Sequence, residues 1–257
     1  MKQRVITGVA LAIAVIIPFW FGGWLLDLLF IACIFLSSYE IVNIFKNKWP
    51  HYTSIFIPII SAFICFIAMK HLSFLLPTIA FFILYLVLLT VVVEEVEVTE
   101  ISLVVFVHVV FIFGLMSYVQ ATTINHLILF FVVIATSSTD TGAYFVGSYF
   151  GRHKLSPKIS PNKTIEGSVG GSLIGTLAAS IFGYFVFGSL FSYKIVILAL
   201  ALTIVGQIGD LLFSAIKRHY EIKDFGSVLP GHGGVLDRID SILVNYMFLF
   251  AVLSWVV

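Results

Sequence analysis

The residues best suited to chemistry are concentrated in one stretch, residues 214–240. Its 27 positions hold four of the fourteen Lys and Arg residues and four of the thirteen acids of a chain that is 60% hydrophobic. Acids inside or at the edge of a membrane usually mark a functional site. This stretch is therefore the first place to look for one.

The spacing before the central loop predicts one polar helix face. The apolar run that ends near Ile216 predicts a helix, on which Asp210, Ser214 and Lys217 stand at positions i, i+4 and i+7. After the loop, Asp237 and Asp240 are i, i+3 neighbours on the first turn of the next apolar run. A carboxylate, a hydroxyl and an ammonium group would thus line one wall, with two more acids close by in sequence.

Residues 230–234, Pro-Gly-His-Gly-Gly, form a glycine-rich turn between the two runs. Glycines let backbone N–H groups approach an anion, and the turn opens onto a helix N-terminus, which favours negative charge. Acids for a metal, cations for phosphates and an anion-binding turn suit metal-assisted transfer at a phosphorus centre.

A second polar group lies earlier in the chain. Asp140, Tyr144 and Gly147 share one helical face of an apolar span, and an acid there must face a polar interior. The loop at 151–167 carries four cations and two Ser-Pro turns. Such a loop either fixes membrane topology or contacts phosphates, and its prolines, which restrict the backbone, favour the second interpretation.

These patterns resemble a known signature. Residues 214–240 read Ser-x-apolar-Lys-Arg, then Lys-Asp-x-small, then apolar-Pro-x-His-Gly-Gly-apolar-x-Asp-Arg-apolar-Asp. This order resembles the signature of the CDP-diacylglycerol synthases, also called phosphatidate cytidylyltransferases, without a departure from it. The run Asp-Thr-Gly-Ala-Tyr and the following Lys-Leu-x-Pro-x-Ile-Ser-Pro-Asn-Lys-Thr-x-Glu-Gly resemble a second block of the same family. The resemblance covers residues 137–240, and the first 125 residues match only in hydropathy.

The resemblance implies an Mg²⁺-dependent nucleotidyltransferase of phospholipid biosynthesis. Such an enzyme joins CTP and phosphatidic acid, a bilayer lipid, and forms CDP-diacylglycerol and pyrophosphate. By likeness, Asp210 and Asp237 are expected to bind the metal and, with Lys217, Asp240 and His232, to serve catalysis. The residues expected to bind substrate are Asp140, Tyr144, Asn162, Lys163, Ser214, Arg218, Gly233, Gly234 and Arg238.

Two other functions compete with this one. A membrane transporter also places acids in glycine-rich, broken spans, but the polar residues here gather in one half of the chain, which favours an enzyme. A CDP-alcohol phosphotransferase is disfavoured because its Asp-Gly-x-x-Ala-Arg motif is absent and Asp140 is followed by Thr-Gly-Ala-Tyr.

Composition predicts the fold class. With 60% hydrophobic and 11% charged residues, and a mean hydropathy of +1.12, the chain is not a soluble domain. We expect an all-α, polytopic integral membrane protein, and the net charge of +1 gives no indication of a nucleic-acid partner. The apolar runs predict nine spans at about 5–21, 22–43, 52–69, 73–93, 101–119, 126–147, 167–190, 193–216 and 235–256.

Loop charges predict the orientation. With the N-terminus in the cytoplasm, twelve of the fourteen Lys and Arg residues fall on the inner side, and only Lys70 and Lys194 fall outside. Cytoplasmic loops carry such an excess of cations. Loops 148–166 and 217–234 would then face the cytoplasm of a bacterial cell, with the protein in its inner membrane.

The two halves differ in how much their sequences reveal. We expect residues 1–125 to form a less specific bundle, in which Asp27 and Glu40 have packing or interfacial roles, and residues 126–257 to form the catalytic bundle. Glycines at 167, 171 and 175 predict a close helix contact, either internal or at a homodimer interface.

Overall fold

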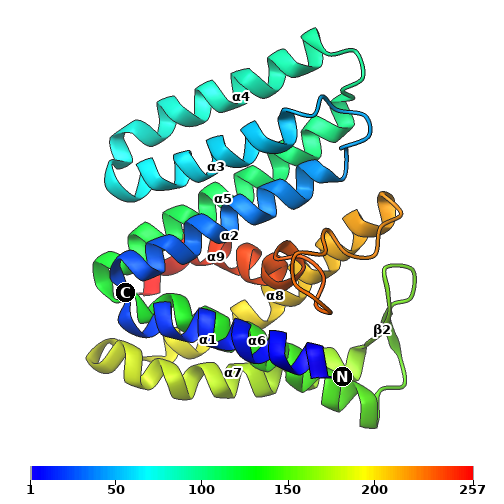
Figure 1. Ribbon diagram of the computed structural model, residues 1–257. Helices are drawn as coiled ribbons and strands as arrows, with labels where there is room; N and C mark the ends of the chain where they lie inside the picture. Colours follow the sequence, from blue (N-terminus) through cyan, green and yellow to red (C-terminus); the bar gives the residue numbers. More distant parts are fainter. Residues whose placement is uncertain (1, 257) are drawn as a thin grey trace. The chain divides into compact units, whose positions relative to one another are not determined.

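The computed structural model describes residues 2–256, and the side chains of residues 6–256 (Figure 1). Eight described helices are long and apolar enough to cross a membrane, and α1 contains a shorter apolar segment, Ile6–Phe21. This confirms an all-α, polytopic membrane protein. The α-helices of the described chain are α1 (Lys2–Phe21), α2 (Gly23–Asn43), α3 (Thr53–Lys70), α4 (Leu75–Val92), α5 (Val98–Ile124), α6 (Leu127–Phe150), α7 (Ile165–Phe187), α8 (Tyr193–His219) and α9 (Leu236–Val256).

The chain divides into two compact units. The first unit contains residues 1–119 and 224–238, and the second contains 120–223 and 239–257. The loop that carries the glycine-rich turn therefore packs with the N-terminal helices, although it lies late in the sequence. This division concerns packing, and the functional division predicted at residue 125 stays a prediction.

Ion pairs connect the loops of the first unit. Lys48 Nζ lies 2.8 Å from Glu97 Oε1 and 2.9 Å from Glu100 Oε1, and the Trp49 indole donates a 2.7 Å hydrogen bond to Glu100. The hydrogen bond from Lys48 lowers the pKa of Glu97. The α2–α3 connection and the α4–α5 connection thus lie at the same end of their helices, as an alternating topology requires.

Glycines on α7 bring it against α6 in the second unit. A Cβ added at Gly171 would lie 2.6 Å from the Thr139 carbonyl oxygen, and one at Gly167 would lie 2.8 Å from that of Ala143. No side chain fits at such distances, so the two backbones touch directly. The predicted glycine contact is therefore internal.

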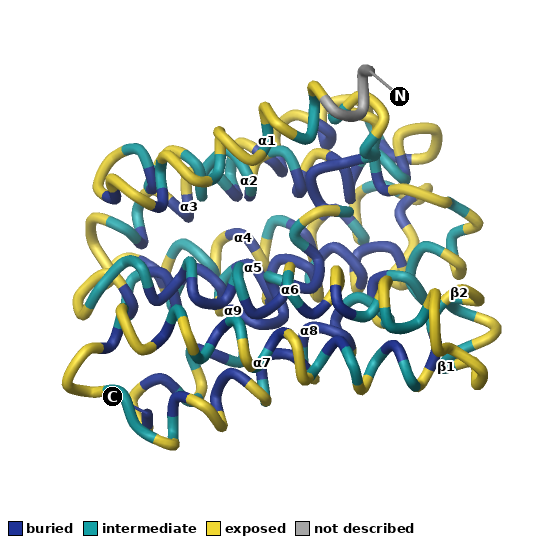
Figure 2. Tube along the Cα trace, turned by 90° about the horizontal axis from the view of Figure 1, so that it is seen from below, coloured by how far each residue is buried: buried dark blue, intermediate teal, exposed yellow. Residues whose placement is uncertain are grey.

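The opposite face of α7 is apolar and exposed. Leu173 and Leu177 are 66% and 64% exposed, and Figure 2 shows exposed residues alternating with buried ones along this helix. Exposed leucines on a spanning helix are the face expected to contact lipid.

Gly171→Ala should destabilise the second unit. The added methyl group meets backbone atoms that cannot move aside, and such overpacking costs about 1–3 kcal/mol. Thermal unfolding of detergent-purified protein measures the effect. Leu173→Ala, two positions further along α7, is the control and should change the unfolding temperature little. Equal stability of Gly171→Ala and the wild-type protein would contradict this packing.

Candidate active site

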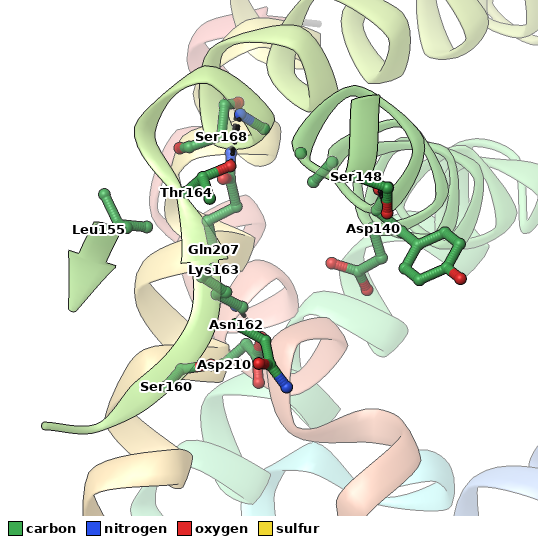
Figure 3. A pocket seen from close by; sticks show the side chains of 14 residues that line it. Asp140, Ser148, Leu155, Ser160, Asn162, Lys163, Thr164, Ser168, Gln207 and Asp210 are labelled. Carbon is green, nitrogen blue, oxygen red and sulfur yellow. Dashed lines mark hydrogen bonds and ion pairs between the residues drawn. The ribbon is translucent and has the colours of Figure 1, made fainter. Parts of the chain in front are cut away.

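A cavity of about 580 Å³ lies within the second unit. Its walls come from α6, from the hairpin that follows it, from the start of α7 and from the middle of α8 (Figure 3). The residues that line it are Asp140, Ala143, Tyr144, Gly147, Ser148, Leu155, Ser160, Asn162, Lys163, Thr164, Gly167, Ser168, Gln207 and Asp210.

An ion pair lies in the wall of this cavity. The Lys163 ammonium donates a hydrogen bond to Asp210 Oδ2 and forms a salt bridge with it, and both side chains are partly buried. Asp140 lies within electrostatic range of both groups. Figure 3 shows Asp140 projecting from α6 on the side of the cavity opposite the strand that carries Lys163. The cavity wall thus contains one cation, Lys163, and two carboxylates, Asp140 and Asp210.

The two acids lie well inside their helices. Asp210 is nine residues before the end of α8 at His219, and Asp140 is ten before the end of α6 at Phe150. At 1.5 Å per residue these separations are about 13 Å and 15 Å. The Lys163 side chain, by contrast, comes from the connection between two spans. The cavity therefore extends from the edge of the spans into their interior.

The connection between α6 and α7 is a β-hairpin, where the sequence suggested only a stiffened loop. Strand β1 (Lys154–Ser156) pairs antiparallel with β2 (Ser160–Thr164), and Lys154 lies opposite Thr164. Pro161 is tolerated because a strand of a two-stranded sheet has a free edge for the residue that lacks an N–H. Both Asn162 and Lys163 lie on β2, between the pairs Lys154–Thr164 and Ser156–Ser160, where the register shifts as at a β-bulge.

Two contacts fix the hairpin to α7. Thr164 caps the helix, because its side chain accepts a 3.1 Å hydrogen bond from the Gly167 amide. Glu166 accepts hydrogen bonds from the amides of Arg152 and His153 at 3.0 and 3.2 Å, and its other oxygen lies 2.6 Å from His153 Nδ1. The position of Lys163 follows from these anchors.

The end of α8 places the other predicted residues of the second unit. Ser214 Oγ donates to Asp210 Oδ1 at 3.5 Å, which puts the two on one face as predicted. Arg218 donates to the carbonyl oxygens of Ile159 and Ile222 at 3.5 and 3.4 Å, so it connects α8 to the hairpin turn. Lys217 lies in the last turn of α8, outside the residues that line the cavity.

The glycine-rich turn belongs to the first unit, and hydrogen bonds connect its residues to one another. Gly233 has a φ of 82°, which favours glycine. The Gly234 amide donates a 3.0 Å hydrogen bond to Asp237 Oδ2, which also accepts from the Phe225 amide at 2.8 Å. The Arg238 guanidinium donates to the His232 carbonyl oxygen at 2.9 and 2.7 Å. These predicted site residues therefore lie together, and hydrogen bonds within the loop connect them.

Asp240 lies on α9, in the second unit. It is 5% exposed, and its Oδ1 accepts a 2.7 Å hydrogen bond from the Ser241 amide. It belongs to the second unit, whereas Asp237, three residues earlier, belongs to the first. Asp210 and Asp237 also fall in different units, and the prediction that they share one ion stays a prediction.

Comparison with known proteins decides the family. Residues 2–256 match the cytidylyltransferase family. The chain belongs to the cytidylyltransferase family.

Curated relatives carry a more specific name. A Bacillus subtilis protein named phosphatidate cytidylyltransferase is 47% identical over 126 residues, which are 49% of this chain and 47% of that protein. One from Staphylococcus haemolyticus is 47% identical over 116 residues, covering 45% and 43%, and one from Staphylococcus epidermidis is 40% identical over 141 residues, covering 55% and 53%. The chain spans about half the length of the curated relatives it matches.

Sequence reasoning missed several residues of this cytidylyltransferase that the structure brings to the site regions, among them Gln207, Ser160 and Glu40. Gln207 lines the cavity one turn before Asp210, and its amide donates to Ser172 Oγ at 2.9 Å. Its i, i+3 spacing from Asp210 could have identified it. Glu40 contacts the glycine-rich loop from α2, more than 190 positions earlier, and no local pattern signals such a contact.

Thr164→Ala should loosen the hairpin from α7. Loss of a Thr N-cap costs about 1 kcal/mol, and here the cap also supports the strand with Lys163. We expect a lower unfolding temperature and faster amide exchange in residues 151–167. Thr164→Ser keeps the hydroxyl and should behave like the wild-type protein. Equal behaviour of the Ala and Ser variants would show that the cap has no such role.

Proposed function

We propose that this member of the cytidylyltransferase family transfers CMP from CTP to phosphatidic acid, forming CDP-diacylglycerol and pyrophosphate. The observation that carries the proposal is the Lys163–Asp210 pair inside a cavity of about 580 Å³. The printed name of the relatives supports the choice of substrates. Membership of the family favours an enzyme over a transporter.

The location of the cavity suits one soluble and one lipid substrate. It extends from the connection between α6 and α7 about 13–15 Å along the helices. A nucleotide can enter such a cavity from water, and a lipid phosphate can reach it from the bilayer surface.

The proposed reaction is a direct displacement at the α-phosphorus of CTP. An anionic phosphate oxygen of phosphatidic acid forms a new P–O bond, and the bond to the β-phosphate breaks, releasing pyrophosphate. The nucleophile is already ionised, so no strong general base is needed. The main barrier is the approach of two polyanions, which cationic side chains lower by neutralising charge that moves onto the leaving group.

Lys163 is the side chain best placed for that role. In the described structure its ammonium is paired with Asp210, and a phosphate oxygen is an equivalent partner for it. Asn162, next to it on β2, adds an amide donor, and Ser160 adds a hydroxyl at the same wall. We propose that these groups bind the triphosphate.

The donor set also fits magnesium. Asp140 and Asp210 offer hard carboxylate oxygens in the cavity, and Mg²⁺ is commonly bound by one or two carboxylates plus substrate phosphates. Among the residues that the structure describes, no three His, Cys, Asp or Glu side chains form a metal site by themselves. When bound, Mg²⁺ would neutralise phosphate charge, and Asp140 and Asp210 would hold it in this cavity. The role of Asp237 as a further ligand stays a prediction.

The membrane orientation is also part of the proposal. Twelve of fourteen Lys and Arg residues fall on one side of a nine-span topology, which supports a cytoplasmic site in a bacterial inner membrane. CTP is made on that side.

The direct test is to incubate the detergent-purified protein with labelled CTP, phosphatidic acid and Mg²⁺ and to analyse the lipid fraction. We expect a labelled CDP-lipid and one pyrophosphate released for each. Asp210→Asn keeps the shape of the side chain and should remove turnover while the protein remains folded by thermal unfolding. Absence of CDP-lipid with the folded wild-type protein would refute the function, and near-normal activity of Asp210→Asn would refute its role.

Lys163→Ala should weaken nucleotide use. A lost charge contact to phosphate typically costs about 1.5–3 kcal/mol, or roughly ten- to a hundredfold in kcat/KM for CTP. Lys158→Ala is the matched control, because Lys158 is a cation of the same hairpin that lies in its turn and outside the cavity lining. Equal kinetics of the two variants would leave the hairpin with only a topological role.

A further inference from the structure

A residue from α2 caps the start of α9, directly after the glycine-rich turn. Glu40, near the end of α2, is 1% exposed. Its two oxygens accept 2.8 Å hydrogen bonds from the Val235 and Leu236 amides. Val235 directly precedes α9 and Leu236 is its first residue, so neither amide has a partner inside the helix. Glu40 and this loop belong to the same unit.

This capping residue is unusual because it is far from the helix in sequence. Helix N-termini are normally capped by a Ser, Thr, Asp or Asn at the cap position itself, but here the acceptor lies 195 residues away in sequence. A buried carboxylate is also a costly acceptor, since the charge must leave water. A carboxylate nevertheless has two advantages over a hydroxyl as a cap. Its two oxygens can accept hydrogen bonds from two consecutive amides, and its charge interacts favourably with the helix dipole.

Two glycines of the loop leave space for this carboxylate. A Cβ added at Gly226 would lie 2.6 Å from Glu40 Oε1, and one at Gly234 would lie 2.5 Å from Glu40 Oε2. The loop therefore closes around the Glu40 side chain from both of its ends. A side chain at either position would displace the Glu40 carboxylate.

The same turn also carries Asp237. Its Oδ2 accepts hydrogen bonds from the Phe225 and Gly234 amides, so the two carboxylates hold neighbouring backbone groups of one loop. Glu40 fixes the amides of residues 235 and 236, directly before Asp237 in the chain. A shift of this first turn of α9 would move Asp237 with it.

We propose that Glu40 is a positioning residue, through which the N-terminal helices set the conformation of the 224–238 loop and the place of Asp237 in the reaction. The inference rests on the proposed function, because it assigns Glu40 a part in that turnover. It gives the N-terminal helices, whose sequence carries no signature, a specific task in catalysis. Glu40 itself acts through the loop backbone and through Asp237.

Glu40→Gln is the test, because the amide keeps the volume but only one of its two ends can accept a hydrogen bond. We expect kcat for CDP-lipid synthesis to fall about tenfold or more, with KM for CTP close to the wild-type value because the proposed triphosphate contacts lie in the second unit. Amide hydrogen exchange in residues 224–238 should become faster, while exchange in α6 and α7 should stay unchanged.

Glu100→Gln is the matched control. Glu100 is also a buried acid of the first unit, 4% exposed, and its partners are Trp49 and Lys48. It should leave both kcat and the exchange of residues 224–238 unchanged. A drop in both for Glu100→Gln would mean that any buried acid of this unit has the same effect, and would overturn the proposal.

The remaining outcomes are also decisive. Normal kcat of Glu40→Gln, or a lower kcat without faster exchange in residues 224–238, would overturn the positioning role. A general loss of folding in Glu40→Gln, seen as faster exchange in every helix, would reduce Glu40 to a stability residue. A folded wild-type protein that makes no CDP-lipid would instead refute the proposed function, and the inference with it.

Discussion

A carboxylate inside an apolar span needs a partner, and this requirement determines which parts of the chain come together. Placing an acid at the centre of a membrane helix costs about 2.5–3.5 kcal/mol on insertion scales. Asp210 is matched by Lys163 from a hairpin, Glu40 by backbone amides of a loop, and Glu100 by Trp49. In each case the partner comes from another segment, so each acid fixes a tertiary contact. The polar groups of the site are thus held by the same interactions that make them tolerable in a membrane.

Backbone contact between α6 and α7 provides the second constraint. Lipid supplies no hydrophobic drive for helix association, so close packing of small residues must do so. Gly167 and Gly171 bring the α7 backbone against α6, and Thr164 starts α7 at the end of the hairpin. Lys163, the preceding residue, is therefore placed by a rigid helix pair. Flexible loops seldom hold a catalytic cation to the precision that charge neutralisation requires.

Local periodicity predicted much of this arrangement. The nine apolar runs correspond to the observed helices within a few residues, because a span needs about 20 apolar residues whatever its neighbours are. The shared face of Asp140, Tyr144 and Gly147 was predicted because the helical repeat alone decides it, and all three line the cavity. The hairpin was not predicted, because a segment with Ser-Pro pairs has the composition of a turn, and its strand pairing depends on contacts with Glu166 and Thr164.

Contacts between distant segments set the limit of such prediction. Glu40 has no helical neighbour that signals its role, and its position at the end of α2 is equally consistent with a simple interfacial acid. What distinguishes it is the pair of amides at the start of α9, together with the space left by Gly226 and Gly234. The signature of residues 214–240 is therefore not a self-contained motif. The start of the signature belongs to α8 in the second unit, as does Asp210 just before it. The glycine-rich turn belongs to the first unit, where it contacts Glu40, a residue outside the signature. A segment with this signature alone would lack the Glu40 contact, and the proposed positioning role of Glu40 would give the N-terminal helices a part in shaping the turn.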